Sequence, residues 1–153
     1  MKHLNTLVPP PVVALIIGIG MWTATQYLSF GKIEFPLRVP IAIALLFTGM
    51  TLLFAAAALF IKAKTTINPL RPSQASTLIT TGVFSISRNP IYLSDLLILG
   101  ALALWLGNII NLMFLLVFFR YITHFQIRPE ERALTQLFGE SYVTYCSKVR
   151  RWV

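Results

Sequence analysis

Long apolar runs alternate with short polar segments along most of this chain. The runs cover residues 12–30, 39–61, 91–106 and 109–126. Most of them are about as long as a helix must be to cross the bilayer core, although the third is slightly short. Gly107 and Asn108 separate the last two runs and form a turn dipeptide, which predicts a helical hairpin. The pattern predicts an all-α membrane protein with about four transmembrane helices.

The C-terminal segment, residues 129–152, has a different pattern. Its apolar and aromatic residues recur at helical spacing, and Gly139 is a point at which the helix could break. Basic residues precede Trp152 near the end of the chain, which is typical of a helix lying on an anionic membrane surface. We therefore expect a C-terminal amphipathic helix, and we expect residues 1–153 to form a single domain.

The composition supports a membrane protein. Hydrophobic residues make up 56% of the chain and charged residues 12%, with a mean hydropathy of +0.73, which is more apolar than soluble domains usually are. The formal net charge is +8, but the basic residues lie at the ends of apolar runs and not along one polar face. We therefore expect no nucleic-acid partner.

The distribution of basic residues predicts the orientation in the membrane. Four spans would place both termini on one side, together with the polar loop of residues 62–89. Ten of the thirteen Lys and Arg residues fall on that side, whereas Lys32 and Arg38 fall on the other. By the positive-inside rule, we expect both termini and the loop to be cytoplasmic. We expect the membrane to be the cytoplasmic membrane of a bacterium or an archaeon. The first run is expected to be a retained span and not a cleaved signal peptide.

Three ionisable residues lie inside the apolar runs. Asp95 and Arg120 fall at similar depths on the two arms of the predicted hairpin, so they could form a structural salt bridge or contact a substrate. His124 lies one helical turn beyond Arg120 and close to the membrane surface, where we expect a hydrated and inert histidine.

A second group of polar residues gathers at the predicted cytoplasmic boundary. Arg88 and Asn89 immediately precede Pro90, which is suited to the first turn of a helix. Glu130 and Glu131 lie in the first turn of the tail helix, where carboxylates stabilise the helix dipole. Opposite charges beside a helix start also suit a zwitterionic ligand. The sequence has no Walker loop, no G-x-G-x-x-G motif and no His/Cys zinc spacing, so no metal site is expected.

These motifs resemble the superfamily of isoprenylcysteine carboxyl methyltransferases and phospholipid methyltransferases. The resemblance rests on Thr65, Thr66 and Asn68-Pro69, on G-x-F-x-x-x-R-N-P-x-Y at residues 82–92, and on E-E-x-x-L-x-x-x-F-G-x-x-Y-x-x-Y-x-x-x-V-x-R-W at residues 130–152. The tail motif is specific because so many spaced positions agree. Many members carry His where this chain has Asn89, so a role that needs a titrating imidazole is lost here.

The resemblance implies an integral membrane enzyme that transfers a methyl group from S-adenosylmethionine to a lipophilic small molecule or a membrane lipid. It implies that the cofactor contacts Arg88, Asn89, Pro90, Tyr92, Glu130 and Glu131. The acceptor stays open among a carboxylate, an amine and a thiol. Arg120 could orient a carboxylate, whereas Asp95 could accept a proton from an amine or a thiol. The alternative is a non-enzymatic transport or scaffold protein in which Asp95 and Arg120 form a structural pair.

Overall fold

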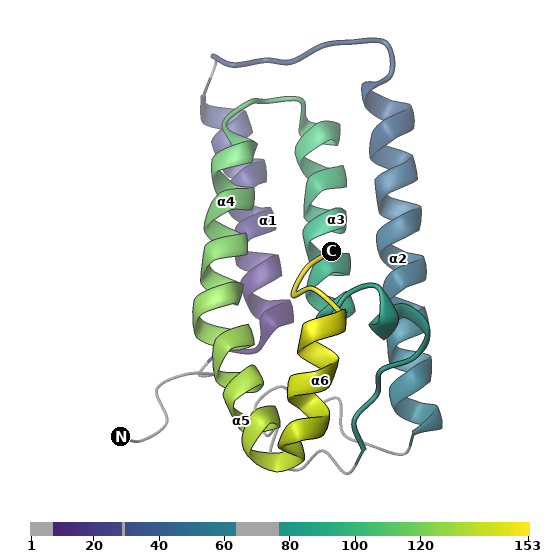
Figure 1. The fold of residues 1–153 in the computed structure, drawn as a ribbon. Coiled ribbons are helices and arrows are strands. Elements are labelled where there is room, and N and C mark those ends of the chain that lie inside the picture. The colour runs from purple at the N-terminus through teal and green to yellow at the C-terminus, as the bar shows by residue number, and fades with distance from the viewer. Residues whose placement is uncertain (1–7, 29, 64–76) are drawn as a thin grey trace.

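Four long helices lie side by side and alternate in direction (Figure 1). The computed structural model describes residues 8–28, 30–63 and 77–153. The long helices are α1 (Pro10–Tyr27), α2 (Arg38–Lys62), α3 (Pro90–Leu106) and α4 (Asn111–Tyr121). Shorter elements complete the fold: η2 (Gly82–Ser85), the π-helical turn η3 (Ile122–Ile127), α5 (Arg128–Phe138) and α6 (Glu140–Lys148). The predicted all-α architecture is confirmed for these residues.

Within the described part of the chain, α2 is the one helix that is both long and apolar enough to cross a membrane, and α3 is a shorter apolar helix. Large apolar side chains also cover the outside of the bundle. Leu15 on α1 is 63% exposed, and Phe47 and Phe54 on α2 are 68% and 64% exposed. An apolar outer surface of this kind is consistent with a membrane protein. The number of spans stays a prediction.

Small residues bring α2 and α3 close together. Ala42, Gly49 and Ala56 are buried and lie seven residues apart, so they share one face of α2. A Cβ atom on Gly49 would lie 3.1 Å from the backbone oxygen of Ser94 on α3. Glycine is therefore needed at this crossing, as is common where helices pack in lipid.

The main core lies among α1, α3 and α4. Met21, Leu99 and Phe118 are buried in it, and the side chain of Trp152 packs against the same cluster. The ring of Trp152 stacks on Phe119 of α4, with a distance of 4.8 Å between the ring centroids. The C-terminal segment is therefore packed against the helix bundle.

The last part of the chain differs from the prediction. The expected span over residues 109–126 and the expected tail helix over 129–152 are continuous, because α4 passes through η3 directly into α5. The chain then reverses at Gly139, which has a φ of 52°, and α6 folds back on the bundle. The tail does not extend as one helix, because Tyr142, Tyr145 and Val149 are buried against Leu78 and Leu134. The helix therefore breaks at Gly139, as the sequence suggested.

At the end of the bundle away from α5 and α6, the α1–α2 connection and the α3–α4 turn bind each other through backbone hydrogen bonds. The amide of Ile33 donates to the carbonyl of Gly107 (2.8 Å), and the amide of Ile109 donates to the carbonyl of Gly31 (2.8 Å). The buried side chain of Asn108 donates to the carbonyl of Phe30 (2.9 Å). These bonds tie the α1–α2 connection to the α3–α4 turn, which confirms the turn predicted at residues 107–108.

Candidate functional site

The start of α3 is tied to the C-terminal segment by hydrogen bonds. Pro90 occupies the first turn of α3, as predicted from the Asn-Pro sequence. The backbone amide of Arg88 donates to the carbonyl of Arg150 (3.0 Å), and the side-chain amide of Asn89 donates to the carbonyl of Arg151 (2.9 Å). Residues about sixty positions apart in the sequence therefore form one wall.

Glu131 on α5 binds two arginines. Its Oε1 lies 3.2 Å from Nη2 of Arg88, and Arg151 donates to both carboxylate oxygens, from Nε (2.9 Å) and from Nη2 (2.7 Å). The side chains of Glu131 and Arg88 are only 16% and 13% exposed. A two-point arginine–carboxylate contact fixes the geometry as well as the charge, and it raises the pKa of Arg151 above its usual value. Glu131 therefore links α5, the start of α3 and the C-terminal segment.

Glu130 has a different environment from its neighbour. Its Oε1 accepts a hydrogen bond from the hydroxyl of Tyr92 (2.5 Å) and another from the side-chain amide of Gln126 (2.7 Å). Burial raises the pKa of Glu130 to about 7, although these two hydrogen bonds act in the opposite direction. Glu130 is thus a carboxyl group that can change its charge near neutral pH.

Gln126 reaches Glu130 along one side of a continuous helix. The two residues are four positions apart, with Gln126 in the π-helical turn η3 and Glu130 in the first turn of α5. Gln126 is buried, so its amide lies in the protein and not in solvent.

The tyrosines of α6 close the site from the C-terminal side. The hydroxyl of Tyr145 donates to the carbonyl of Phe84 in η2 (2.6 Å). Burial raises the pKa of Tyr145 to about 12 and that of Tyr142 further above its usual range, so both phenols stay neutral. Cys146 on the same helix contacts Nη1 of Arg88. The α6 helix is therefore held against both η2 and the start of α3.

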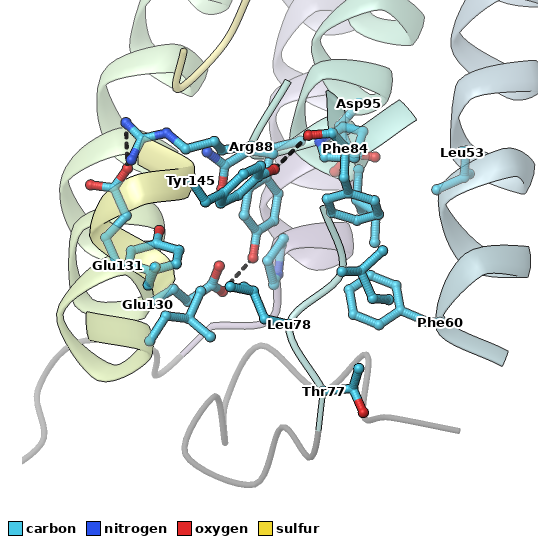
Figure 2. A pocket seen from close by; sticks show the side chains of 18 of the residues that line it. Leu53, Phe60, Thr77, Leu78, Phe84, Arg88, Asp95, Glu130, Glu131 and Tyr145 are labelled. Carbon is cyan, nitrogen blue, oxygen red and sulfur yellow. Dashed lines mark hydrogen bonds and ion pairs between the residues drawn. The ribbon is translucent and has the colours of Figure 1, made fainter. Parts of the chain in front are cut away.

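These elements surround a cavity of about 370 Å³, which is within the usual range for small-molecule sites. Glu130 and Glu131 of α5 lie on one side of it, opposite Leu53 and Phe60 of α2 (Figure 2). Most of the lining is apolar, and the ionisable groups are concentrated near α5 and the start of α3. The lining residues are Pro10, Pro11, Leu53, Phe60, Thr77, Leu78, Ile79, Phe84, Arg88, Asn89, Pro90, Ile91, Tyr92, Asp95, Glu130, Glu131, Leu134, Tyr142 and Tyr145.

The structure brings together seven of the eight residues proposed from the sequence. The cavity lining includes Arg88, Asn89, Pro90, Tyr92, Asp95, Glu130 and Glu131. Arg120 is not among them: it is exposed on α4. Asp95 and Arg120 do not form a salt bridge, one of the two alternatives considered for them, since the ion pairs of the described residues both involve Glu131. Similar depth on neighbouring helices did not bring the two side chains onto facing surfaces.

His124 is exposed, as expected, and its Nδ1 lies 3.4 Å from Nη1 of Arg128. The loop motif residues Thr65, Thr66, Asn68 and Pro69 lie outside the described residues. Sequence reasoning missed the roles of Gln126 and Arg151 as partners of the two glutamates. The spacing of four residues between Gln126 and Glu130 was the available signal for the first.

Comparison with known proteins identifies a family match that covers most of the chain. Residues 37–141 match the phospholipid methyltransferase family. A stretch of 62 residues, 40% of this chain, is 48% identical to an uncharacterized protein of Haemophilus influenzae and covers 98% of that relative. No solved structure matches the chain. The family match extends over more than half of the sequence and includes α2, α3 and both glutamates, so the chain belongs to the phospholipid methyltransferase family.

Proposed function

We propose that this protein transfers a methyl group from S-adenosylmethionine to a lipophilic acceptor at the cytoplasmic boundary of a membrane. The observation that carries the proposal is the cavity in which Glu130, Glu131 and Arg88 meet a largely apolar lining. Family membership supports methyl transfer, and this donor set suits a cofactor that combines positive charges, a carboxylate and a ring system.

The residues present fit such a cofactor. Glu130 and Glu131 offer carboxylates for its ammonium and hydroxyl groups, and Arg88 offers a guanidinium for its carboxylate. The aromatic rings of Phe84 and Tyr145, also part of the lining, offer apolar surface for the adenine. When bound, S-adenosylmethionine supplies an electrophilic methyl group on a sulfonium.

The chain's own contribution is chiefly to position the reactants and to exclude water. Methyl transfer is a displacement that requires the nucleophile to be held in line and close to the methyl carbon. The α5–α6 hairpin covers the cavity on one side, fixed by the contacts of Glu131 to Arg88 and Arg151. A site covered in this way is protected from competing water.

We also propose that the four long helices span the membrane with both termini in the cytoplasm. Their alternating directions support this topology, as does the meeting of the α1–α2 connection with the α3–α4 turn at one end. Single cysteines introduced at Lys32 and at Thr77 are expected to be labelled from opposite sides. Labelling of both from one side would contradict the topology.

The non-enzymatic alternative rested on a structural pair between Asp95 and Arg120. That pair is not formed in the described part of the chain, and Asp95 instead lines the cavity. A transport or scaffold role therefore has less support than methyl transfer.

Calorimetric titration of the purified protein with S-adenosylmethionine and with its demethylated product tests the proposal. We expect both ligands to bind, because they share the ammonium, carboxylate and ring groups that the cavity suits. Glu130→Gln is expected to lower the affinity by about 1–3 kcal/mol, the size of a charge-assisted hydrogen bond. The matched control is Glu140→Gln, since Glu140 is exposed on α6 and is not part of the cavity. Equal affinities in wild type and Glu130→Gln would count against this site.

A further inference from the structure

The outer face of the continuous helix formed by α4, η3 and α5 changes from apolar to basic along its length. Leu116 is 64% exposed, and Met113 and Val117 are exposed beside it. Arg120 follows at helical spacing and is also exposed. Positions i, i+3, i+4 and i+7 share one face of a helix, so this face ends in a guanidinium where α4 meets η3. Its apolar part suits lipid chains, and its basic end suits an anion.

Two further side chains continue this face at intervals of four residues. His124 and Arg128 are exposed, and Nη1 of Arg128 lies 3.4 Å from Nδ1 of His124. A guanidinium has no acceptor, so Nδ1 accepts in this contact and Nε2 carries the ring hydrogen. Arg120 and Arg128 are eight residues apart, which is about 12 Å at the usual helix rise, and His124 lies between them. These three side chains, which we call the basic face, offer donors on both sides of His124.

The chain's own carboxylates do not neutralise the basic face. Three of the five acidic residues line the cavity, and the other two are Glu34 in the α1–α2 connection and Glu140 on α6. The ion pairs of the described residues both involve Glu131, and neither involves Arg120 or Arg128. An anion that balances the basic face therefore comes from outside the chain.

With α4 in the membrane as proposed above, we propose that the basic face binds the phosphate of an anionic phospholipid, whose acyl chains lie along the apolar part of α4. A charged side chain on a lipid-facing helix is costly unless it is paired, and lipid phosphates are the anions available where an apolar helix face ends. Arginine suits this partner, because its planar donors match the oxygens of a phosphate.

The net charge of the headgroup decides which lipid binds. In a zwitterionic phospholipid, the ammonium of the headgroup offsets the phosphate and is repelled by the two guanidiniums. In an anionic phospholipid, the phosphate has no such neighbour. The basic face therefore favours an anionic lipid, and this preference does not depend on methyl transfer.

Native mass spectrometry of the purified protein in detergent tests the binding. The probes are phosphatidylglycerol and phosphatidylcholine with the same two acyl chains, which differ in the net charge of the headgroup. We expect phosphatidylglycerol to have a dissociation constant about tenfold lower, the effect of one charge-assisted hydrogen bond. Glycerol 3-phosphate, which has the phosphate without the chains, should not compete. Equal affinities for the two lipids would overturn the proposal, and displacement by glycerol 3-phosphate would overturn it in favour of a soluble phosphate ligand.

Substitutions that remove one charge test where the lipid binds. Arg120→Gln and Arg128→Gln should each weaken the binding of phosphatidylglycerol by about tenfold, since each removes one charge-assisted contact. Lys148→Gln is the matched control, because Lys148 is exposed on α6, outside the basic face, and its loss changes the net charge equally. The control should bind like wild type. An equal loss in all three variants would assign the binding to overall charge, and no loss in either arginine variant would contradict the site.

Two measurements separate the lipid site from the cavity and from misfolding. Both arginine side chains are exposed, so the melting temperature of each Gln variant without added lipid should match that of wild type. The dissociation constant of S-adenosylmethionine should also be unchanged, because Arg120 and Arg128 are outside the cavity lining. If cofactor affinity or melting temperature falls in parallel with lipid binding, the basic face acts through the fold or the cavity, and the proposed lipid site is wrong.

Discussion

The two ends of the helix bundle use similar polar groups for different purposes. At the end formed by the α1–α2 connection and the α3–α4 turn, Asn108 and Arg38 donate to backbone carbonyls at 2.9 Å. At the other end, Arg88 and Arg151 converge on Glu131 beside a cavity, and the pKa of Glu130 is raised to about 7. In the first case polar side chains complete the backbone hydrogen bonding. In the second, ionisable side chains border space that a ligand can fill, which is typical of a functional site.

The largest effect is expected from Glu131, because it holds two arginines. Glu131→Gln leaves both guanidiniums without their counter-charge, and we expect the free energy of unfolding to fall by about 3 kcal/mol, the lower end for breaking a buried ion pair. Unfolding followed by circular dichroism in detergent measures this loss. Glu140→Gln, on the exposed start of α6, is the control. A loss no larger than that of the control would mean that the ion pairs do not stabilise this end.

At the end of the bundle formed by the α1–α2 connection and the α3–α4 turn, a substitution is expected to change stability but not cofactor affinity. Gly107 has a φ of 63°, and a Cβ there would lie 1.6 Å from Nη1 of Arg38. Gly107→Ala should therefore lower the free energy of unfolding by about 1–3 kcal/mol, the cost of a strained backbone position. Gly100→Ala, in the middle of α3, is the matched control. The α3–α4 turn lies at the end of the bundle away from α5 and α6 (Figure 1), so the affinity for S-adenosylmethionine should not change. A parallel loss of affinity would show that the two ends are coupled.

A smaller and more specific effect is expected from the titration of Glu130. Its folded pKa of about 7 lies above the ordinary value of 4.5, so the neutral form is favoured in the folded protein. Its contribution to stability is greatest below about pH 4.5 and is lost as the pH rises through about 7. A cationic ligand favours the ionised form, so its binding must release a proton below pH 7.

We therefore expect the affinity for S-adenosylmethionine to rise by up to about tenfold per pH unit below pH 7 and to level off above it. Calorimetry in buffers with different ionisation enthalpies measures the proton release directly. Glu130→Gln should remove both the slope and the released proton. A slope that persists in Glu130→Gln would assign the titration to another group.

Much of the site could be predicted because its residues lie in local patterns. Asn-Pro predicts the start of α3, so the position of Arg88 follows from a short motif. Glu130 lies in a helix, as predicted, but this helix continues from α4 through η3 and does not start anew at Pro129. The pairing of Arg151 with Glu131 could not be predicted in this way. It depends on the chain reversing at Gly139, and periodicity does not specify where a segment packs after a reversal.

The absence of a pair between Asp95 and Arg120 has a related cause. The helix rise gives the depth of a residue, but facing also depends on rotation about the helix axis, which changes by about 100° per residue. Asp95 lines the cavity, whereas Arg120 is exposed on α4. Depth alone was therefore insufficient evidence for a pair.

The smallest effect is expected from Asn89, which immediately precedes α3 in the wall of the cavity. Its side-chain amide makes one neutral hydrogen bond, to the carbonyl of Arg151, so Asn89→Ala should lower the free energy of unfolding by about 1 kcal/mol. Asn89→His should lose less, because an imidazole N–H can donate to the same carbonyl. If the amide serves only to hold the C-terminal segment, any loss of cofactor affinity should follow the loss of stability. Asn89→Ala should then lose more of both than Asn89→His. An affinity that falls by far more than stability in Asn89→Ala would instead mean that this amide contacts the cofactor itself, and would move Asn89 from the wall of the cavity into the binding contacts.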